Sequence, residues 1–273
     1  MRGVETMIRL PAVAGRFYPS DPAELARLIS QYTFKSAKKR NALGCLVPHA
    51  GYVYSGHVAG AVYSELEIPG CCILLGPRHF PRGEPLSILT EGLWQTPLGQ
   101  ARIDSTLGRA LANMFPRLRE DAIAQETEHS LEVQIPFLLQ LAPDFRFVPV
   151  LLATDRYAVL EELGHAVAAV VQARGEPVLV IASSDMNHYE NDAVTRAKDQ
   201  RAIERILALD PRGLYDTVRN GEISMCGYAA AVAMLVAVND LGATNAELIR
   251  YATSGDVTGE REQVVGYAGC IFH

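Results

Sequence analysis

Three stretches of the sequence place a histidine shortly after an apolar, strand-like run. They are Val47-Pro48-His49, Leu75-Gly76-Pro77-Arg78-His79, and the stretch from Ile181 to His188. Open α/β sheets bind their ligands at the carboxyl ends of their strands. Imidazole is a common metal ligand and also a general acid or base near neutral pH. The three motifs therefore predict a metal-binding or catalytic cleft.

A single histidine in such a place is more often structural than functional, but three in the same context favour a shared site. The other histidines lie in different surroundings. His57 and His165 fall within helical patterns and His273 is the last residue, so we expect all three to be structural or solvated. His129 is considered separately below.

Cys226 differs from the other cysteines because it lies between turn-prone residues, just before the apolar run 228–238. A thiolate at a helix N-terminus has a lowered pKa and is a good ligand for soft metals. We interpret the remaining cysteines as small buried apolar residues; they are Cys45, Cys71, Cys72 and Cys270.

A further cluster of acidic residues surrounds His129, with Glu126 three residues before it and Glu132 three residues after it. At this spacing either pair could share one helix face. A helix is predicted over 128–141, bent or broken at Pro136. A single Glu-x-x-His is weak support for a metal site, since di-iron bundles need two. We therefore place His129 near the ligands or the substrate, and interpret Glu126, Glu128 and Glu132 as a capping and solvated group.

Apolar strand-like runs alternate with helical patterns along the whole chain, with no linker or repeat between them. This alternation predicts one α/β domain over 1–273, with a central mixed or mostly parallel sheet covered by helices on both faces. The predicted strands are 44–47, 71–75, 86–90, 146–152, 178–182, 248–253 and 263–271. The predicted helices are 22–31, 56–66, 104–114, 128–141, 157–172, 192–209, a short one from Pro211, and 227–238.

Composition and charge exclude several classes of protein. The net charge is −6, and we interpret the basic cluster 35–40 as a solvated loop rather than a nucleic-acid patch. Five cysteines without a CxxC pair favour a reducing, cytoplasmic compartment. The N-terminal stretch lacks the apolar centre of a signal peptide, and 228–238 is too short to span a bilayer.

Common catalytic motifs are also missing from the sequence, which has no GxGxxG, Walker loop, HExxH or GxSxG. A Ser–His–Asp hydrolase site could draw on Ser183 or Ser184, Asp185 and His188. These residues are too close in sequence for one turn to give triad geometry, so we do not favour that interpretation.

The motifs above resemble those of the Memo family, whose bacterial and archaeal members are called AmmeMemoRadiSam system protein B. The matching motifs occur in the same order as in the family and extend over nearly the whole chain. The matching motifs are Ala14–Pro19, Pro48–Gly56, Leu75–His79, Thr96–Gly99, Glu128–Glu132, Val148–Leu151, Ser183–Asp185 with His188 and Tyr189, Cys226–Tyr228, and Val265–Tyr267.

This resemblance implies a fold like that of the class III, LigB-type extradiol dioxygenases. Those enzymes bind Fe(II) through two histidines and one carboxylate, and a further histidine acts as acid and base. Carried across by motif, the metal ligands are His49, His79 and Cys226, His188 is the acid/base, and Asp185 orients its neighbours. Cysteine in place of the carboxylate favours thiolate-bound iron or copper, or zinc, over an ordinary Fe(II) oxygenase centre.

Two functions therefore compete. One is a metal-dependent redox protein or oxidoreductase that holds iron or copper. The other is a non-catalytic module that binds a peptide or small ligand in the same cleft, lined by Phe17, Tyr18, Tyr52 and Tyr54; eukaryotic relatives are described as binders of phosphotyrosine peptides. The family name also suggests a partner in a radical-SAM pathway, although the chain lacks the CxxxCxxC motif of a radical enzyme. We expect neither nucleic-acid nor membrane binding.

Overall fold

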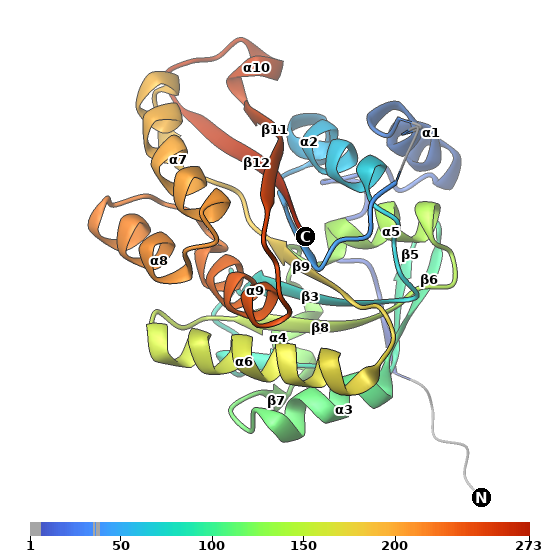
Figure 1. Ribbon diagram of the computed structural model, residues 1–273. Helices are drawn as coiled ribbons and strands as arrows, with labels where there is room; N and C mark the ends of the chain where they lie inside the picture. The colour runs from blue at the N-terminus through green and yellow to red at the C-terminus, as the bar shows by residue number, and fades with distance from the viewer. Residues whose placement is uncertain (1–6, 35, 37–38) are drawn as a thin grey trace, which may run out of the picture.

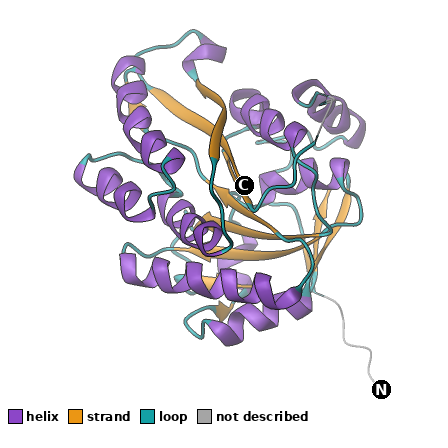
Figure 2. Ribbon diagram, viewed as in Figure 1, coloured by secondary structure: helices purple, strands orange, loops and turns teal. Residues whose placement is uncertain are grey.

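Apolar strands at the centre of the molecule form one mixed sheet that lies between two layers of helices (Figures 1 and 2). The computed structural model describes residues 7–34, 36 and 39–273. The main path of the sheet has the order β1-β5-β6-β8-β3-β9-β2-β12-β10, with β11 beside β12 and β4 beside β8. The predicted α/β class and mixed sheet are thereby confirmed.

The bounds of the strands are β1 (Ile8–Arg9), β2 (Gly44–Val47), β3 (Cys71–Pro77), β4 (Leu86–Ile88), β5 (Leu93–Thr96), β6 (Gly99–Ile103), β7 (Arg119–Glu120), β8 (Arg146–Leu152), β9 (Leu179–Ser183), β10 (His188–Glu190), β11 (Ala246–Thr253) and β12 (Val264–Phe272). The helices are α1 (Pro22–Tyr32), α2 (Tyr52–Glu65), α3 (Ser105–Met114), α4 (Ala122–Glu126), the 3-10 turn η1 (Glu132–Gln134), α5 (Ile135–Leu141), α6 (Tyr157–Arg174), α7 (Asp192–Leu207), α8 (Pro211–Asn220), α9 (Tyr228–Asp240) and α10 (Gly255–Thr258).

The central strands β8, β3, β9 and β2 are parallel and are buried on both faces. Their side chains alternate between two separate cores, as the period of a strand requires. In β3, Ile73 and Leu75 join the core beneath α3, α6 and α9, whereas Cys72 and Leu74 join the core beneath α1, α2 and α5. The free cysteines Cys45, Cys71, Cys72 and Cys270 are all buried, which confirms their interpretation as apolar residues.

The strand order brings the predicted site residues to one edge of the sheet. β9 pairs in parallel with β2 on one side and with β3 on the other. The segments that leave these three strands carry His49, Asp185 and His79, so these residues meet where the strands end. The parallel core thus positions these three residues, whereas Cys226 comes from the turn between α8 and α9.

Two local predictions were wrong. The hairpin formed by β5 and β6 was missed; its turn lies at residues 97–98, and β6 adds in parallel to β8. The helix predicted over 128–141 begins only at Ile135 and follows the short turn η1. Before it, Glu128 Oε1 accepts hydrogen bonds from the backbone N–H groups of His129 and Ser130, in a segment that is not helical.

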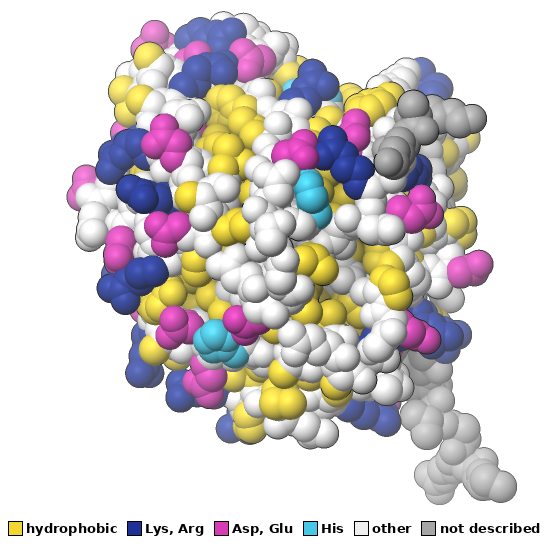
Figure 3. Space-filling view, in the orientation of Figure 1, with side chains coloured by type: hydrophobic (Ala, Val, Ile, Leu, Met, Phe, Trp, Pro, Cys, Tyr) yellow, Lys and Arg dark blue, Asp and Glu magenta, His cyan; other side chains and the backbone are white. Residues whose placement is uncertain are grey.

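The face shown in Figure 3 carries Lys and Arg side chains interspersed with Asp and Glu side chains. Charged side chains of the described residues form several pairs, such as Arg212 with Asp216 on α8. The basic segment 35–40 lies partly outside the described residues. Within the part of the chain that is described, no helix combines the length and the apolar character needed to cross a membrane.

Candidate metal centre and cleft

Three soft or borderline donor atoms converge at the carboxyl edge of the sheet. His49 Nε2 lies 3.2 Å from Cys226 Sγ, and the His49 and His79 ring centroids are 5.2 Å apart. The three residues each offer a ligand atom, and these atoms lie within 4.8 Å of one another. The fold therefore brings together the His49, His79 and Cys226 set predicted from the sequence.

The hydrogen bonds of His49 determine which ring nitrogen carries its proton. Ser183 Oγ donates to Ser130 O at 2.6 Å and accepts from Gln134 Nε2 at 3.0 Å. Because the only hydroxyl proton of Ser183 is used, its contact of 3.0 Å with His49 Nδ1 requires Nδ1–H as donor. His49 Nε2 therefore presents a lone pair to Cys226. Burial, with the nearby His129 and His79, lowers the pKa of His49 well below its usual range and keeps the ring neutral.

His79 is oriented in the same way by Glu128. Its Nδ1 lies 2.9 Å from Glu128 Oε1, and its backbone N–H donates to Oε2. Burial alone would raise the pKa of Glu128, but the hydrogen bonds and charge of His79, with His129 nearby, lower that pKa to about 2. The carboxylate is thus ionised and can only accept, so His79 Nδ1–H donates the hydrogen bond. A carboxylate behind a histidine in this manner is typical of metal centres.

Cys226 lies just before α9, next to its N-cap residue Gly227. Burial raises the pKa of the Cys226 thiol, with the Asp185 carboxyl group as the second cause. The lowered pKa predicted from a helix N-terminus is therefore wrong for the metal-free protein, because desolvation outweighs the helix. A bound cation would reverse this, since a coordinating thiol is deprotonated outright.

Asp185 and His188 lie beside these three residues. Asp185 Oδ1 accepts the backbone N–H groups of His49 at 2.7 Å and Ala50 at 3.2 Å, and burial raises its pKa. His188 begins the short strand β10 rather than following β9 directly, and its Nδ1 lies 2.9 Å from Ser224 O. Since a carbonyl only accepts, Nδ1 carries the proton. Asp185, His188 and Cys226 form a second group whose possible ligand atoms are close together.

His129 lies in the site, although not on a helix. Its ring stacks on His79 with centroids 4.5 Å apart and also contacts Phe17 at 4.7 Å. Burial lowers the pKa of His129. His79, Glu128 and His129 form a third group of possible ligand atoms. The prediction thus placed His129 near the other site residues, but it assumed a helix that does not form there.

The acidic residues around His129 are not a solvated group. Only Glu126 is exposed, whereas Glu128 and Glu132 are each 1% exposed. Glu132 pairs with Arg9 at 2.7 Å and accepts hydrogen bonds from Ala12 N, Val13 N and Tyr18 Oη. The prediction was wrong because the partners of both carboxylates come from distant segments. Glu132 thereby fastens the N-terminal segment 9–18 beside the cleft.

Gln134 was missed altogether by the sequence reasoning. Its Nε2 donates to Pro48 O at 2.9 Å and to Ser183 Oγ at 3.0 Å, and its Oε1 accepts from Tyr63 Oη. It is fully buried, and its hydrogen bond helps to fix the orientation of the Ser183 hydroxyl, which in turn orients His49. Its position in the Leu131-Glu132-Val133-Gln134 run, polar between apolar residues, was the available signal.

A cleft with a volume of about 870 Å³ opens over these residues. Phe17 and Tyr54 line it as predicted, together with Tyr189 and Tyr267. Tyr18 and Tyr52 do not, and that prediction was wrong: Tyr18 donates to Glu132, and Tyr52 donates to Val133 O. Ser183 and Ser184 both donate to backbone carbonyls, so neither is placed as a nucleophile.

A mixed α/β sheet with a His–His–Cys cluster at its strand ends defines a candidate metal-binding α/β protein. The sequence profile of the family described as Memo-like protein matches residues 9–271. The chain belongs to the Memo family. Its relatives include a MEMO1 family protein of Methanothermobacter thermautotrophicus, 42% identical over 96% of this chain and 99% of that protein. Another, from Methanopyrus kandleri, is 41% identical over 97% of this chain and 99% of its own length.

A solved structure also matches. The crystal structure of an uncharacterised protein from Escherichia coli K12 aligns with a TM-score of 0.51 over 82% of this chain and 98% of that one. The two sequences are 14% identical, so the likeness concerns the fold alone.

Proposed function

We propose that this chain is a metal-dependent redox protein that holds an iron or copper ion through His49 Nε2, His79 Nε2 and Cys226 Sγ. The observation that carries the proposal is the commitment of both Nδ1 atoms as donors inside the protein. This leaves two imidazole lone pairs and one thiol at a single place beside the cleft. Two nitrogens and a sulfur suit copper, thiolate-bound iron or zinc better than a hard cation such as Mg²⁺.

When bound there, iron or copper supplies electron transfer and a Lewis-acid centre. Other residues of the protein hold the proposed ligands in position. Asp185 fixes the backbone of His49 through two N–H groups, and Glu128 fixes His79 through its ring and its backbone. His188, anchored through Nδ1 on Ser224 O, has Nε2 left to accept or return a proton in the cleft.

Metal content after anaerobic loading with Fe(II), Cu(I) or Zn(II) tests the proposal. We expect one tightly held ion in the unaltered protein and a loss of at least tenfold in affinity, roughly the effect of removing a ligand or its orienting partner, in Cys226→Ser and His79→Ala. His165→Ala is the matched control, because this exposed histidine on α6 lies outside the cluster. Equally weak metal retention in all four proteins would refute the proposal.

A second candidate function is ligand binding in the same cleft without turnover. It is favoured by the exposure of the cleft's aromatic side chains, since Tyr54 is 40% exposed and Tyr189 is 73% exposed. Calorimetric titration of metal-free and metal-loaded protein separates the two functions. Ligand affinity that is unchanged by metal, with no oxygen uptake in the presence of catechols, would favour simple binding.

A further inference from the structure

We propose that the cleft selects ligands that carry an aromatic ring and a cationic ammonium group, with Tyr189 and Tyr54 contacting the ring and Glu260 contacting the cation. This inference deepens the proposed function, because the same cleft contains the proposed metal centre. It concerns the choice of ligand and rests on side chains other than the three metal-ligand candidates.

The charges that line the cleft are the first observation. Among the described residues lining it, Asp185 and Glu260 are acidic and none is Lys or Arg. Proteins that recognise phosphate or carboxylate groups use Arg clusters and charge-assisted hydrogen bonds. Four histidines also line the cleft, but burial lowers the pKa of His49 and of His129. Without a Lys or Arg side chain, the cleft favours a neutral or positively charged ligand over an anionic one.

The arginines nearest in sequence to the lining residues are engaged elsewhere. Arg78 donates to the carbonyls of residues 82 and 83, and Arg16 lines a separate hollow around Met7 and Ile123. Arg261 pairs with Asp192 at 3.0 Å and with Asp256 at 3.1 Å. None of these three guanidinium groups lines the cleft.

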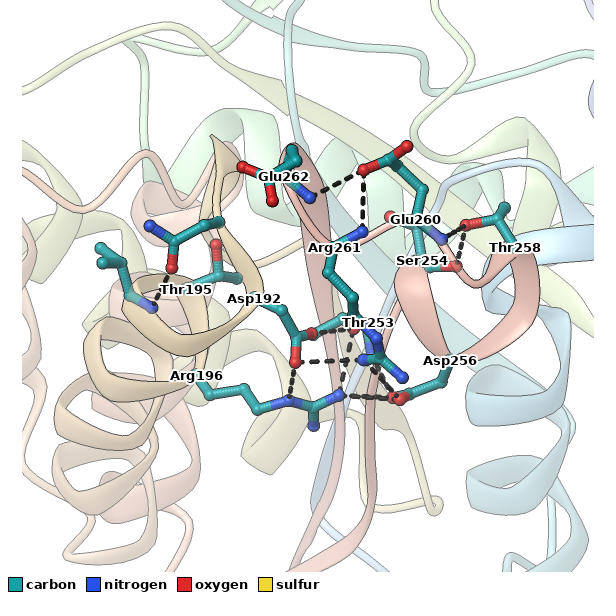
Figure 4. Close-up of polar contacts among 12 residues, drawn as sticks. Asp192, Thr195, Arg196, Thr253, Ser254, Asp256, Thr258, Glu260, Arg261 and Glu262 are labelled. Atoms are coloured by element: carbon teal, nitrogen blue, oxygen red, sulfur yellow. Dashed lines mark hydrogen bonds and ion pairs between the residues drawn. The ribbon is translucent and has the colours of Figure 1, made fainter.

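Glu260 is held in place before any ligand arrives. Its Oε1 accepts the backbone N–H groups of Arg261 at 2.9 Å and Glu262 at 2.8 Å, and in Figure 4 its other oxygen points away from them. Its own N–H donates to Thr258 Oγ1 at 3.1 Å. A carboxylate fixed in this way loses little further freedom when it binds a cation.

An ion network fastens the whole segment that carries Glu260. Arg196 on α7 binds Asp192 at 2.9 Å and both oxygens of Asp256 at 2.8 Å, which joins α7 to α10 (Figure 4). Asp256 also accepts the backbone N–H of Thr253, at the end of β11. The rim of the cleft at α10 is thus built on the sheet and not on a free loop.

Tyr189 is the second, independent observation. Its φ of 61° lies in the left-handed region that bulky residues avoid, at a register shift between His188 and Glu190 in β10. Strained residues of this kind persist mainly at ligand-binding and active sites. The ring is 73% exposed, so burial does not explain its conformation. With Tyr54 it gives the cleft aromatic faces that attract both rings and cations.

Three probes that share a benzene ring test the inference: tyramine, which carries an ammonium group, and 4-hydroxyphenylacetate and phenyl phosphate, which are anionic. Calorimetry on metal-free protein removes any pull of a metal on the anionic probes. We expect tyramine to bind about tenfold more tightly than 4-hydroxyphenylacetate, since the ammonium meets a carboxylate and the carboxylate probe meets like charge. Tyr189→Ala should weaken tyramine binding by about fivefold through the lost ring contact.

Glu260→Gln should reduce the preference for tyramine by about threefold or more, the size of a partly screened ion pair. Glu262→Gln is the matched control, since this neighbouring carboxylate does not line the cleft, and it should leave the preference unchanged. Equal or tighter binding of either anionic probe, or no measurable binding of tyramine, would overturn the inference. Metal retention is measured in a separate assay on the same protein variants. A failure of the metal centre is thereby distinguished from a failure of ligand selection.

Discussion

Replacing Glu128 by glutamine is the most direct perturbation of the proposed metal centre that leaves every ligand in place. The Glu128 carboxylate accepts from His79 Nδ1, from His79 N, and from the N–H groups of His129 and Ser130. All four partners are donors. An amide keeps one acceptor oxygen but turns an NH2 group towards a donor, and it removes the negative charge behind His79.

The expected effects follow from this geometry. Loss of the partner that orients a metal-bound histidine typically costs 10- to 100-fold in metal affinity, which is about 1.4–2.8 kcal/mol. A hydrogen bond to a charged group contributes roughly 1.5–3 kcal/mol to stability, and at least one is lost. We therefore expect Glu128→Gln to fold with a lowered unfolding free energy and to bind metal at least tenfold more weakly.

Competitive titration against a chelator of known affinity measures the first effect, and urea unfolding of metal-free protein measures the second. Glu126→Gln is the control, because this exposed carboxylate lies only two residues away. If Glu128→Gln retains the metal affinity of the unaltered protein while remaining folded, the assignment of His79 as a ligand oriented by Glu128 is refuted.

Three further predictions concern stability. Burial raises the pKa of Asp199 to about 7, so its contribution to stability is fully present below pH 4 and is lost as the pH rises to 7. The difference in unfolding free energy between Asp199→Asn and the unaltered protein should therefore grow by up to about 3 kcal/mol in favour of the variant between pH 5 and 7. A difference in urea unfolding that stays constant with pH would contradict this. Glu132→Gln leaves the Arg9 guanidinium buried without its counter-charge, so thermal unfolding should show a loss of about 3–5 kcal/mol. Gly164→Ala would place a methyl 2.5 Å from Val236 Cβ between α6 and α9 and should cost about 1–3 kcal/mol, whereas Gly70→Ala, with open space around it, should be near neutral.

The parallel core and the strand-end histidines could be predicted from the sequence because their signals are local, whereas the choice of His49, His79 and Cys226 as ligands came from the resemblance to the Memo family. The strand predicted over 146–152 has the observed bounds of β8, and the one predicted over 44–47 has those of β2. Fully apolar runs between helical patterns leave few alternatives to a buried parallel strand. Once two such strands each end in a Pro–Gly-flanked histidine, their convergence follows from the sheet.

The polar interior of the site could not be predicted, because each of its members is satisfied by a partner far away in sequence. Glu132 is buried with Arg9 as its counter-charge, and Glu128 is buried with hydrogen bonds from the ring and the backbone of His79. The local sequence reveals neither of these distant partners. Glu128 and Glu132 were therefore interpreted as the solvated start of an ordinary helix. The pKa of Cys226 was misjudged for a related reason, since desolvation depends on what covers the thiol.

The segment from Glu128 to Glu132 binds the N-terminal stretch with one end and a metal-ligand candidate with the other. Arg9 reaches both ends, pairing with the Glu132 carboxylate and donating to Glu128 O at 2.6 Å. Because binding energies are reciprocal, any factor by which an ion at His79 tightens the docking of residues 9–18 equals the factor by which that docking tightens the ion. The rate at which a protease cleaves residues 9–18 would then report the metal occupancy of the site.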